Sequence, residues 1–353
     1  MKIVIANNLY YPYNRGGAET VVKNMIADLK ARGHEVFLIT TKPKNDVDPK
    51  NPNLKIYYIP SDYSRLAEFS PLKKVLWHFT NIFSFKSTTA IKKILADEKP
   101  GLILTHNLMG LGFLLPVAIR DLNITHRHYL HDIQLLYPSG LIMFGEENII
   151  DGFSAKVYQL FTRYFFGSPN KIISPSNWLL EQHRQRGFFP DSKTEIKNLI
   201  KTDPEEKIEI LLKTSNPKTN FLFVGQIEIH KGIILLINSF REALLTEPNL
   251  KLIIVGDGEK LNTAKELAAD VKQIEFKGHL NSEEVKALMM ASDCLIIPSL
   301  CYENAPMTIF EAHNANLSVL AANIGGIPEI INNNDKLFKP GDITDLKNNI
   351  LNT

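Results

Sequence analysis

Glu303 and Glu311 are two carboxylates eight positions apart, in a segment that reads as a strand end followed by a helix start. Asn304 is a residue type that favours helix N-caps. Pro306 suits the first helical turn, because the amide that proline lacks would have no intrahelical partner there. We therefore expect a helix to open close to Ala305, with its free amides and positive dipole end facing an anionic group such as a diphosphate.

A nucleoside diphosphate sugar has the length and the chemistry to meet both carboxylates. Glu303 lies in the loop and Glu311 about two turns along the expected helix, so roughly 10 Å can separate them at 1.5 Å per residue. One carboxylate can accept hydrogen bonds from ribose hydroxyls and the other from a hexose, with the diphosphate between them on the helix-start amides. On spacing alone, a solvated loop charge and an ordinary surface glutamate of the helix remain the alternative.

A cation and two glycine turns lie where a bound diphosphate would need them. Gly225 and Gln226 follow a predicted strand, and Lys231 follows at a helix start, where it can supply counter-charge to phosphates. Gly16 and Gly17, also between a strand and a helix, can let backbone amides approach the same diphosphate across a cleft. An incidental surface lysine and an ordinary turn are the alternatives that the residues leave open.

Histidines gather at another predicted strand. His126 and His128 fall on one face of this strand, and His131 and Asp132 follow at its end. A zinc site would need a fourth ligand in an appropriate geometry, so the clustered histidines alone do not indicate one. Asp132 can orient the imidazole of His131 or cap the next turn.

The Asp-x-Asp pattern at 46–48 imitates a metal site, but its Lys, Pro and Asn neighbours predict a solvated turn.

The composition is typical of a soluble globular protein of about two domains. The chain has 353 residues, of which 44% are hydrophobic and 22% charged, and a net charge of +2. Residues 1–170 form the basic half, with 20 Lys and Arg against 14 Asp and Glu. The two cysteines, Cys294 and Cys301, provide neither a disulfide framework nor a cysteine metal site, which indicates a reducing compartment. No signal-peptide or membrane-span pattern is present, so we expect a cytoplasmic protein.

Short apolar runs alternate with helical patterns, which predicts an α/β protein with two doubly wound domains that face a cleft. We place these domains at 1–198 and 199–353, and ligands at the carboxyl ends of their strands. Residues 195–218 read as the connection, with a short helix near 205–213. The expected strands are 2–6, 35–40, 55–59, 102–105, 125–130, 171–173, 220–224, 251–255, 273–276, 294–297 and 318–321, and expected helices include 19–32, 232–244, 260–269, 282–291 and 306–314.

The candidate segments also occur in a recognisable order. The order is Gly16-Gly17-Ala18-Glu19, Gly225 through Lys231-Gly232, Val255-Gly256-Asp257-Gly258, Ala291 through Ser299, the two glutamates, and Gly325-Gly326-Ile327-Pro328-Glu329. Over nearly the whole chain it resembles the Glu-x7-Glu signature of the retaining family-4 glycosyltransferases, which have the GT-B fold.

This resemblance implies a retaining transferase that moves a hexose-type sugar from a nucleoside diphosphate sugar to a hydroxyl of a glycan or lipid-linked acceptor, in cell-surface polysaccharide synthesis. The first domain would bind the acceptor and the second the donor, without a cofactor or metal, and no nucleic acid is expected as a partner. Glu303 would hold the hexose, Lys231 would stabilise the departing diphosphate, and His131 would be a sugar-binding and catalytic-site residue. The nucleotide-sugar site would comprise Gly16, Gly17, Gly225, Gln226, Lys231, Glu303, Asn304, Met307, Thr308 and Glu311.

The sequence departs from the family pattern in three places. Gln226 stands where the family usually has arginine, and Asn316 and Ser318 stand where it usually has glycine and proline. The chain also ends at Thr353, without the usual long helix that returns to the first domain. These departures keep open a catalytically weak GT-B-like subunit that binds glycan or a true transferase, with a sugar-nucleotide epimerase of the same fold as a third hypothesis.

A basic, aromatic segment at 64–95 is a candidate membrane surface. It contains Lys73, Lys74 and Trp77 among many other apolar and basic residues. Such a segment can lie on an anionic bilayer, which would suit a lipid-linked acceptor and a position on the inner membrane face. The alternative is that its aromatic residues pack against helices of the first domain.

Overall fold

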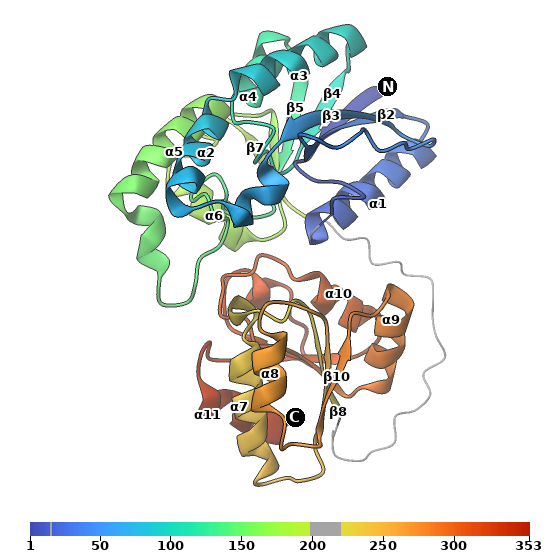
Figure 1. The fold of residues 1–353 in the computed structure, drawn as a ribbon, viewed down its shortest axis with the longest axis vertical. Helices are drawn as coiled ribbons and strands as arrows, with labels where there is room; N and C mark the ends of the chain where they lie inside the picture. The colour runs from blue at the N-terminus through green and yellow to red at the C-terminus, as the bar shows by residue number, and fades with distance from the viewer. Residues whose placement is uncertain (15, 198–219) are drawn as a thin grey trace. The chain divides into compact units, whose positions relative to one another are not determined.

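The computed structural model describes residues 1–14, 16–197 and 220–353. The chain forms two compact units (Figure 1). Unit 1 comprises Met1–Leu141 and Asn148–Leu199, and unit 2 comprises Ile142–Glu147 and Ile200–Thr353. The segment Ile142–Glu147, which we call the strap, therefore belongs to unit 2, although we expected it within the first domain.

Unit 1 is built on a seven-stranded parallel sheet with the order β3-β2-β1-β4-β5-β6-β7. Ile3 pairs with Val36 of β2 and with Leu102 of β4, which sets β1 between these strands. Apolar runs such as that of β1 are buried on both faces, as is typical of parallel strands covered by helices. The strands are β1 (Lys2–Ala6), β2 (Glu35–Pro43), β3 (Lys55–Ser61), β4 (Leu102–Thr105), β5 (Thr125–Tyr129), β6 (Lys171–Ser174) and β7 (Lys193–Ile196).

Helices connect the successive strands of unit 1, except β2 and β3, which have no helix between them (Figure 1). Phe83, at the end of α2, contacts the rings of Phe161 and Phe165 in α5, so these two helices lie side by side. The helices are α1 (Gly17–Ala31), α2 (Pro71–Ile82), α3 (Phe85–Glu98), α4 (Leu115–Asp121), α5 (Phe153–Phe166) and α6 (Asn177–Arg184), with 3-10 turns η1 (Tyr63–Glu68) and η2 (Glu147–Asp151).

Unit 2 repeats this architecture with a six-stranded parallel sheet of order β10-β9-β8-β11-β12-β13. Strands β9 and β10 lie on one side of β8, and strands β11, β12 and β13 lie on the other. This is the doubly wound order of a dinucleotide-binding fold. The strands are β8 (Asn220–Val224), β9 (Lys251–Val255), β10 (Ile274–Gly278), β11 (Cys294–Ile297), β12 (Ser318–Ala322) and β13 (Lys336–Phe338).

The helices of unit 2 enclose a single buried cluster around this sheet, with Leu236, Ile254 and Leu295 among its fully buried members. The start of α9 is well defined, because the Asn281 side chain accepts from the amide of Glu284 while the Glu284 carboxylate accepts from that of Asn281. The helices are α7 (Ile233–Leu244), α8 (Leu261–Leu267), α9 (Ser282–Ala291), α10 (Met307–Asn314) and α11 (Ile343–Leu351), with 3-10 turns η3 (Ile229–Lys231) and η4 (Ile327–Glu329).

The expectation of two doubly wound α/β domains is confirmed, with differences at particular elements. Glu195 lies in β7 and not in a connection, and β13 and α11 were not anticipated. Helix α1 begins two residues earlier than expected, because the Glu19 carboxylate accepts from the Gly16 amide and so caps the helix from its first turn. The short helix expected near 205–213 lies outside the described residues.

Candidate functional site

The site in unit 2 forms where the order of its sheet reverses. Strands β8 and β11 are neighbours from which the connections leave in opposite directions, and ligands of such sheets bind at the carboxyl ends of these strands. The segment after β8 carries Lys231 in η3, and the segment after β11 carries Glu303. Two residues that are 72 positions apart are thereby brought together.

Lys231 and Glu303 form an ion pair. The Lys231 Nζ lies 2.6 Å from Glu303 Oε1, and the two side chains are only 27% and 16% exposed. The same carboxylate oxygen accepts a hydrogen bond of 3.0 Å from the Ser299 hydroxyl. Glu303 is therefore held from two sides, by a charge and by a neutral donor.

The electrostatics keep both members of this pair charged at neutral pH. Burial raises the pKa of the Glu303 carboxyl, but the Lys231 charge and the hydrogen bonds from Lys231 and Ser299 outweigh burial and hold that pKa below its ordinary value. Burial likewise lowers the pKa of Lys231, yet the charges of Glu303 and Cys301 and the hydrogen bond to Glu303 together outweigh burial, so this pKa lies above its ordinary value. The site holds an anionic hydrogen-bond acceptor beside a cation that an anionic ligand can attract.

Close backbone packing explains two glycines around Glu303. Gly325 has φ +63°, and a Cβ there would lie 2.1 Å from the Glu303 carbonyl oxygen. The next amide, that of Gly326, donates to the same oxygen at 2.8 Å. On the other side, a Cβ on Gly232 would lie 1.7 Å from the carbonyl oxygen of Pro298. Because Gly232 lacks a side chain, the segment that carries Lys231 can approach the end of β11, and because Gly325 lacks one, residues 325–326 can approach Glu303.

The helix start after Glu303 differs from our expectation. Helix α10 begins at Met307 with Pro306 as its N-cap, so the prediction of an Asn304 cap and a helix opening near Ala305 is wrong. A proline disfavours the helical conformation of the residue before it, which excludes Ala305 from the helix and moves the start beyond Pro306. The later start puts Glu311 little more than one turn along the helix, not two.

The first amides of α10 remain suited to an anion. Met307 and Thr308 are the first two helical residues, and their amides lack carbonyl partners within the helix. Glu311 is exposed on the same helix, although burial by neighbouring atoms still raises the pKa of its carboxyl. This region thus presents backbone donors near a carboxylate that is open to solvent.

Gly225 and Gln226 occupy the turn after β8. The Gly225 amide donates to the carbonyl of Val255 at 3.0 Å, so this amide is engaged within the protein. Gln226 is exposed and provides no charge. Within the described residues of this turn and η3, Lys231 supplies the cation closest to Glu303.

The strap packs against the segment that carries Glu303. The amide of Phe144 donates to the carbonyl of Leu300 at 2.8 Å, and the amide of Tyr302 donates to that of Ile142 at 2.9 Å. The Tyr302 hydroxyl donates to Glu147 at 2.7 Å, which helps to hold the pKa of the Glu147 carboxyl below its ordinary value after the larger effect of the Gly145 amide. The strap therefore fixes residues 300–302 immediately before Glu303.

In unit 1, Gly16 and Gly17 lie at the start of α1. The Gly16 amide donates to Glu19 at 2.7 Å and is used for capping. The Gly17 amide lies in the first helical turn, where amides lack intrahelical partners. The structure thus retains one of the two amides that we considered for a diphosphate.

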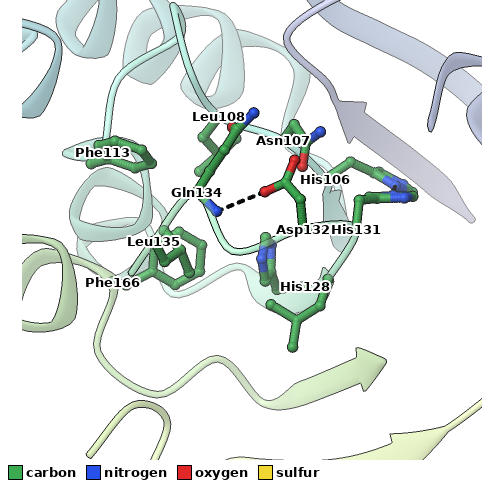
Figure 2. Close-up of a pocket in the computed structure, with 11 residues that line it drawn as sticks. His106, Asn107, Leu108, Phe113, His128, His131, Asp132, Gln134, Leu135 and Phe166 are labelled. Atoms are coloured by element: carbon green, nitrogen blue, oxygen red, sulfur yellow. Dashed lines mark hydrogen bonds between the residues drawn. The ribbon is translucent and has the colours of Figure 1, made fainter. Parts of the chain in front are cut away.

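His131 and Asp132 follow β5 and line a narrow pocket (Figure 2). The Asp132 carboxylate accepts from the Gln134 amide at 2.7 Å, so it caps the following turn, the second of the two roles we considered. Burial raises the pKa of Asp132 to about 7, against the opposing effects of Gln134 and Asn107. His131 Nε2 lies 2.7 Å from Nδ1 of His106.

The two histidines within β5, His126 and His128, both contact the Thr105 hydroxyl. His126 Nε2 and His128 Nδ1 lie 2.7 and 2.9 Å from the hydroxyl oxygen of Thr105, which confirms that they share one face of the strand. Within residues 1–14, 16–197 and 220–353, no group of three or more His, Cys, Asp or Glu side chains is arranged to hold a metal ion. The Asp-x-Asp pattern at 46–48 is an exposed turn, as expected.

Sequence reasoning overlooked Ser299, Tyr302 and His106. Ser299 and His106 follow strand ends, where ligands of parallel sheets bind, so their position was a signal that could have identified them. Tyr302 had no such signal, because its role depends on the strap, which is more than 150 positions away in the chain.

Comparison with known families assigns the chain to a class. The model for Glycosyltransferase Family 4 matches residues 15–203, and the model for Glycosyl transferases group 1 matches residues 204–352. The chain therefore belongs to the group 1, family 4 glycosyltransferases, and it is a transferase enzyme.

Relatives and solved structures agree with this assignment. An uncharacterized 42.6 kDa protein in the cps region of Klebsiella pneumoniae is 26% identical over 98% of this chain and 91% of its own length. The alpha-monoglucosyldiacylglycerol synthase of Streptococcus pneumoniae is 24% identical over 96% of this chain and 74% of its own. The structure of Anabaena HepE in complex with UDP has a TM-score of 0.69 and 18% identity, over 99% of this chain and 89% of that one, which supports the GT-B fold.

Proposed function

We propose that this enzyme is a retaining glycosyltransferase that moves a hexose-type sugar from a nucleoside diphosphate sugar to a hydroxyl of a glycan or lipid-linked acceptor. The observation that carries the proposal is the Lys231–Glu303 ion pair at the reversal point of the unit 2 sheet, beside the start of α10. The HepE complex with UDP supports a nucleotide-linked donor. Relatives such as the glucosyldiacylglycerol synthase and a Salmonella lipopolysaccharide N-acetylglucosaminetransferase support a role in cell-surface polysaccharide or glycolipid synthesis.

The ion pair supplies both groups that such a donor needs. Without ligand, Lys231 neutralises Glu303. When a diphosphate binds, its charge attracts the Lys231 ammonium and the amides of Met307 and Thr308. Glu303, still held by the Ser299 hydroxyl, can then accept hydrogen bonds from hexose hydroxyls, while Glu311 accepts from the ribose.

The same groups assist the transfer. The bond between the anomeric carbon and the diphosphate oxygen breaks, and the anomeric carbon bonds to the acceptor oxygen on the same face. The acceptor proton passes to the departing diphosphate oxygen. Lys231 and the two helix-start amides stabilise the negative charge that develops on this oxygen, and prearranged donors of this kind accelerate reactions strongly. We assign the acceptor to unit 1 and propose His131 as a sugar-binding residue of that unit.

The stereochemistry of the product tests the proposal. Proton NMR of the new linkage should show an α-glycoside when the donor is an α-linked nucleotide sugar such as UDP-glucose. A β-linkage would contradict retention. Failure to hydrolyse or transfer any of a panel of nucleotide sugars would instead favour the catalytically weak binding subunit.

Unit 1 also offers a surface suited to a membrane. Four apolar residues of α2 (Leu72, Val75, Leu76 and Phe79) and four of α5 (Phe153, Val157, Leu160 and Tyr164) are exposed. Each set recurs every three or four residues and therefore forms a stripe on one face of its helix. Leu72 is 82% and Phe153 86% exposed, so these residues do not pack the core. We call the two stripes together the α2/α5 surface.

An anionic bilayer is the partner that fits the α2/α5 surface. Neither helix contains Asp or Glu, whereas Lys73, Lys74, Lys156 and Arg163 lie on them. Apolar helix faces with basic neighbours bind the boundary between headgroups and acyl chains of anionic membranes. No helix among the described residues is both long and apolar enough to cross a bilayer. We therefore propose peripheral binding at the cytoplasmic face of the membrane, close to a lipid-linked acceptor.

A further inference from the structure

His106 is a buried histidine for which the proposed reaction provides no role. It follows β4 directly, and its backbone amide donates to the carbonyl of Ala6 at 2.8 Å. Its ring stacks on Tyr129, with 4.8 Å between centroids and 6° between the ring planes. The side chain is fully buried, so the strand end and the stacked ring hold it in one orientation.

His106 meets His131 through one pair of ring nitrogens. His106 Nδ1 lies 2.7 Å from His131 Nε2, so one nitrogen carries the proton that the other accepts. Burial lowers the pKa of His106 well below its ordinary value and that of His131 to about 4, which leaves both rings neutral at neutral pH. A neutral imidazole has one N–H group and one bare nitrogen. The pair therefore has two arrangements, in which either His106 or His131 is the donor.

The second nitrogen of His106 distinguishes these arrangements. His106 Nε2 is buried and has no hydrogen-bond partner among the described residues. If His131 were the donor, His106 would carry its own proton on Nε2, as a buried N–H group without an acceptor. If His106 is the donor, Nε2 is only a bare acceptor. Orphaned buried N–H groups are rarer in folded proteins than acceptors that lack a partner, so the second arrangement is favoured.

We propose that His106 is a positioning residue that donates from Nδ1 to His131 Nε2 and thereby fixes the tautomer of His131. In this tautomer the proton of His131 lies on Nδ1, and Nε2 is occupied. The Nε2 of His131 then cannot remove the proton of an acceptor hydroxyl. The consequence for catalysis rests on the proposed sugar transfer, whereas the tautomer does not depend on it.

Nitrogen NMR measures this tautomer directly. Long-range proton–nitrogen correlation spectra of ¹⁵N-labelled protein separate protonated from bare ring nitrogens, and the signals that disappear in His131→Asn assign those of His131. We expect the protonated nitrogen of His131 to be Nδ1 at pH 7. A proton on His131 Nε2 in the parent protein would overturn the proposal without any variant.

Two substitutions of His106 separate its hydrogen bond from its packing. His106→Asn keeps an amide N–H group close to the place of Nδ1 but loses the aromatic ring, whereas His106→Phe keeps a ring against Tyr129 but loses the donor. We expect His131 to remain protonated on Nδ1 in the Asn variant and to become a mixture of tautomers in the Phe variant. The same His131 tautomer in the Phe variant and the parent would show that His106 does not fix it.

Turnover provides a second readout. With a nucleotide-sugar donor, kcat should fall about five- to tenfold in His106→Phe, the effect of one lost hydrogen bond, and should stay near the parent value in His106→Asn. Equal losses in both variants would indicate a packing role and contradict the proposal. If the parent shows the expected tautomer but no transfer of any sugar, the proposed function fails while the assignment of His106 stands.

Discussion

Lys231 and Glu303 each reduce the free-energy cost of burying the charge of the other. Both side chains are mostly buried, and they hold opposite charges in a region where water reaches them only in part. Loss of one partner from such a pair leaves the other charge without compensation, and this penalty usually exceeds the net contribution of the intact pair. Stability should therefore report on the pair independently of any ligand.

We predict that Lys231→Met lowers the free energy of unfolding by about 2 kcal/mol at pH 7, because Glu303 becomes an uncompensated, mostly buried charge. In the parent, the pKa of Glu303 lies below its ordinary value, so the group stabilises the fold above that value and loses this contribution as the pH falls through the lowered pKa. In the variant, the effects of Lys231 are lost and the smaller effects of Ser299 and His230 remain, so burial raises this pKa relative to the parent. Urea unfolding should therefore show a difference between the proteins that shrinks as the pH falls from 7 toward 4.

Lys251→Met serves as the control, because Lys251 is an exposed lysine at the start of β9. It should change stability little at any pH. A constant difference between Lys231→Met and the parent across the pH range would argue against the charge pairing of Glu303.

Glu311 should contribute to nucleotide binding and not to the fold. We predict that Glu311→Ala weakens UDP binding by about 1.5–3 kcal/mol, the range for hydrogen bonds to a charged group, while the melting temperature changes little because the side chain is exposed. Isothermal titration calorimetry measures the affinity. Glu266→Ala, an exposed glutamate of α8, is the matched control, and equal affinities in both variants would remove Glu311 from the ribose site.

The candidate residues could be identified from the sequence, but their partners could not. Strand-end positions pointed to Lys231 and Glu303, because parallel sheets bind ligands at the carboxyl ends of their strands, whereas the role of His131 came from the family resemblance. That Lys231 binds Glu303 itself in the absence of ligand depends on the close approach of two segments, which strand patterns do not specify. Asn316, in contrast, has φ +52°, as its place at a usual glycine suggested, so this departure from the family is benign.

At the level of elements, the start of α10 shows how local rules compete. Asn304 is a good N-cap by residue type, but Pro306 restricts the residue before it, and the steric effect decides where the helix begins. The strand β13 is only three residues long and carries too little pattern to be recognised. Strands with a continuous apolar run, such as β1 and β11, were placed at the bounds that the structure shows.

The α2/α5 surface makes an element-level prediction. Changing Lys73 and Lys74 to Glu should reduce sedimentation with anionic phosphatidylglycerol vesicles at low salt, because each basic residue near such a surface contributes about 1 kcal/mol. The same loss should be smaller at high salt, where screening already weakens the attraction. Turnover with a soluble acceptor should not change, since neither lysine lies in the candidate site.

An equal charge change elsewhere is the control for this experiment. Lys265→Glu with Lys272→Glu alters two exposed lysines of unit 2 and should leave sedimentation nearly as in the parent. Phe153→Ser should weaken binding at low and high salt alike, because it removes apolar contact. The opposite outcome has two parts: none of the three changes affects sedimentation, and light scattering shows a dimer that Phe153→Ser dissociates. Together these results would assign the α2/α5 surface to a second copy of the chain.

At the level of the whole molecule, each unit has its own buried core, and the candidate donor site lies in unit 2. We predict two thermal transitions in calorimetry, of which UDP raises only that of unit 2. At a ligand concentration of about 100 times Kd, the stabilisation should reach about 2.7 kcal/mol. Leu104→Ala, in the core of unit 1, should lower the other transition and thereby identify it. If UDP raises the transition of unit 1 instead, the nucleotide binds to unit 1 and the proposed donor site in unit 2 is contradicted.

The strap has a consequence for engineering by recombination. Chimeric enzymes are commonly assembled by joining the front half of one family member to the back half of another at the connection between them. In this protein such a junction would leave Ile142–Glu147 from one parent against residues 300–302 from the other. Tyr302 would then face a foreign side chain where Glu147 now accepts a hydrogen bond from its hydroxyl. A functional hybrid that takes a new sugar specificity from the back half should therefore import the six strap residues as a second, internal graft.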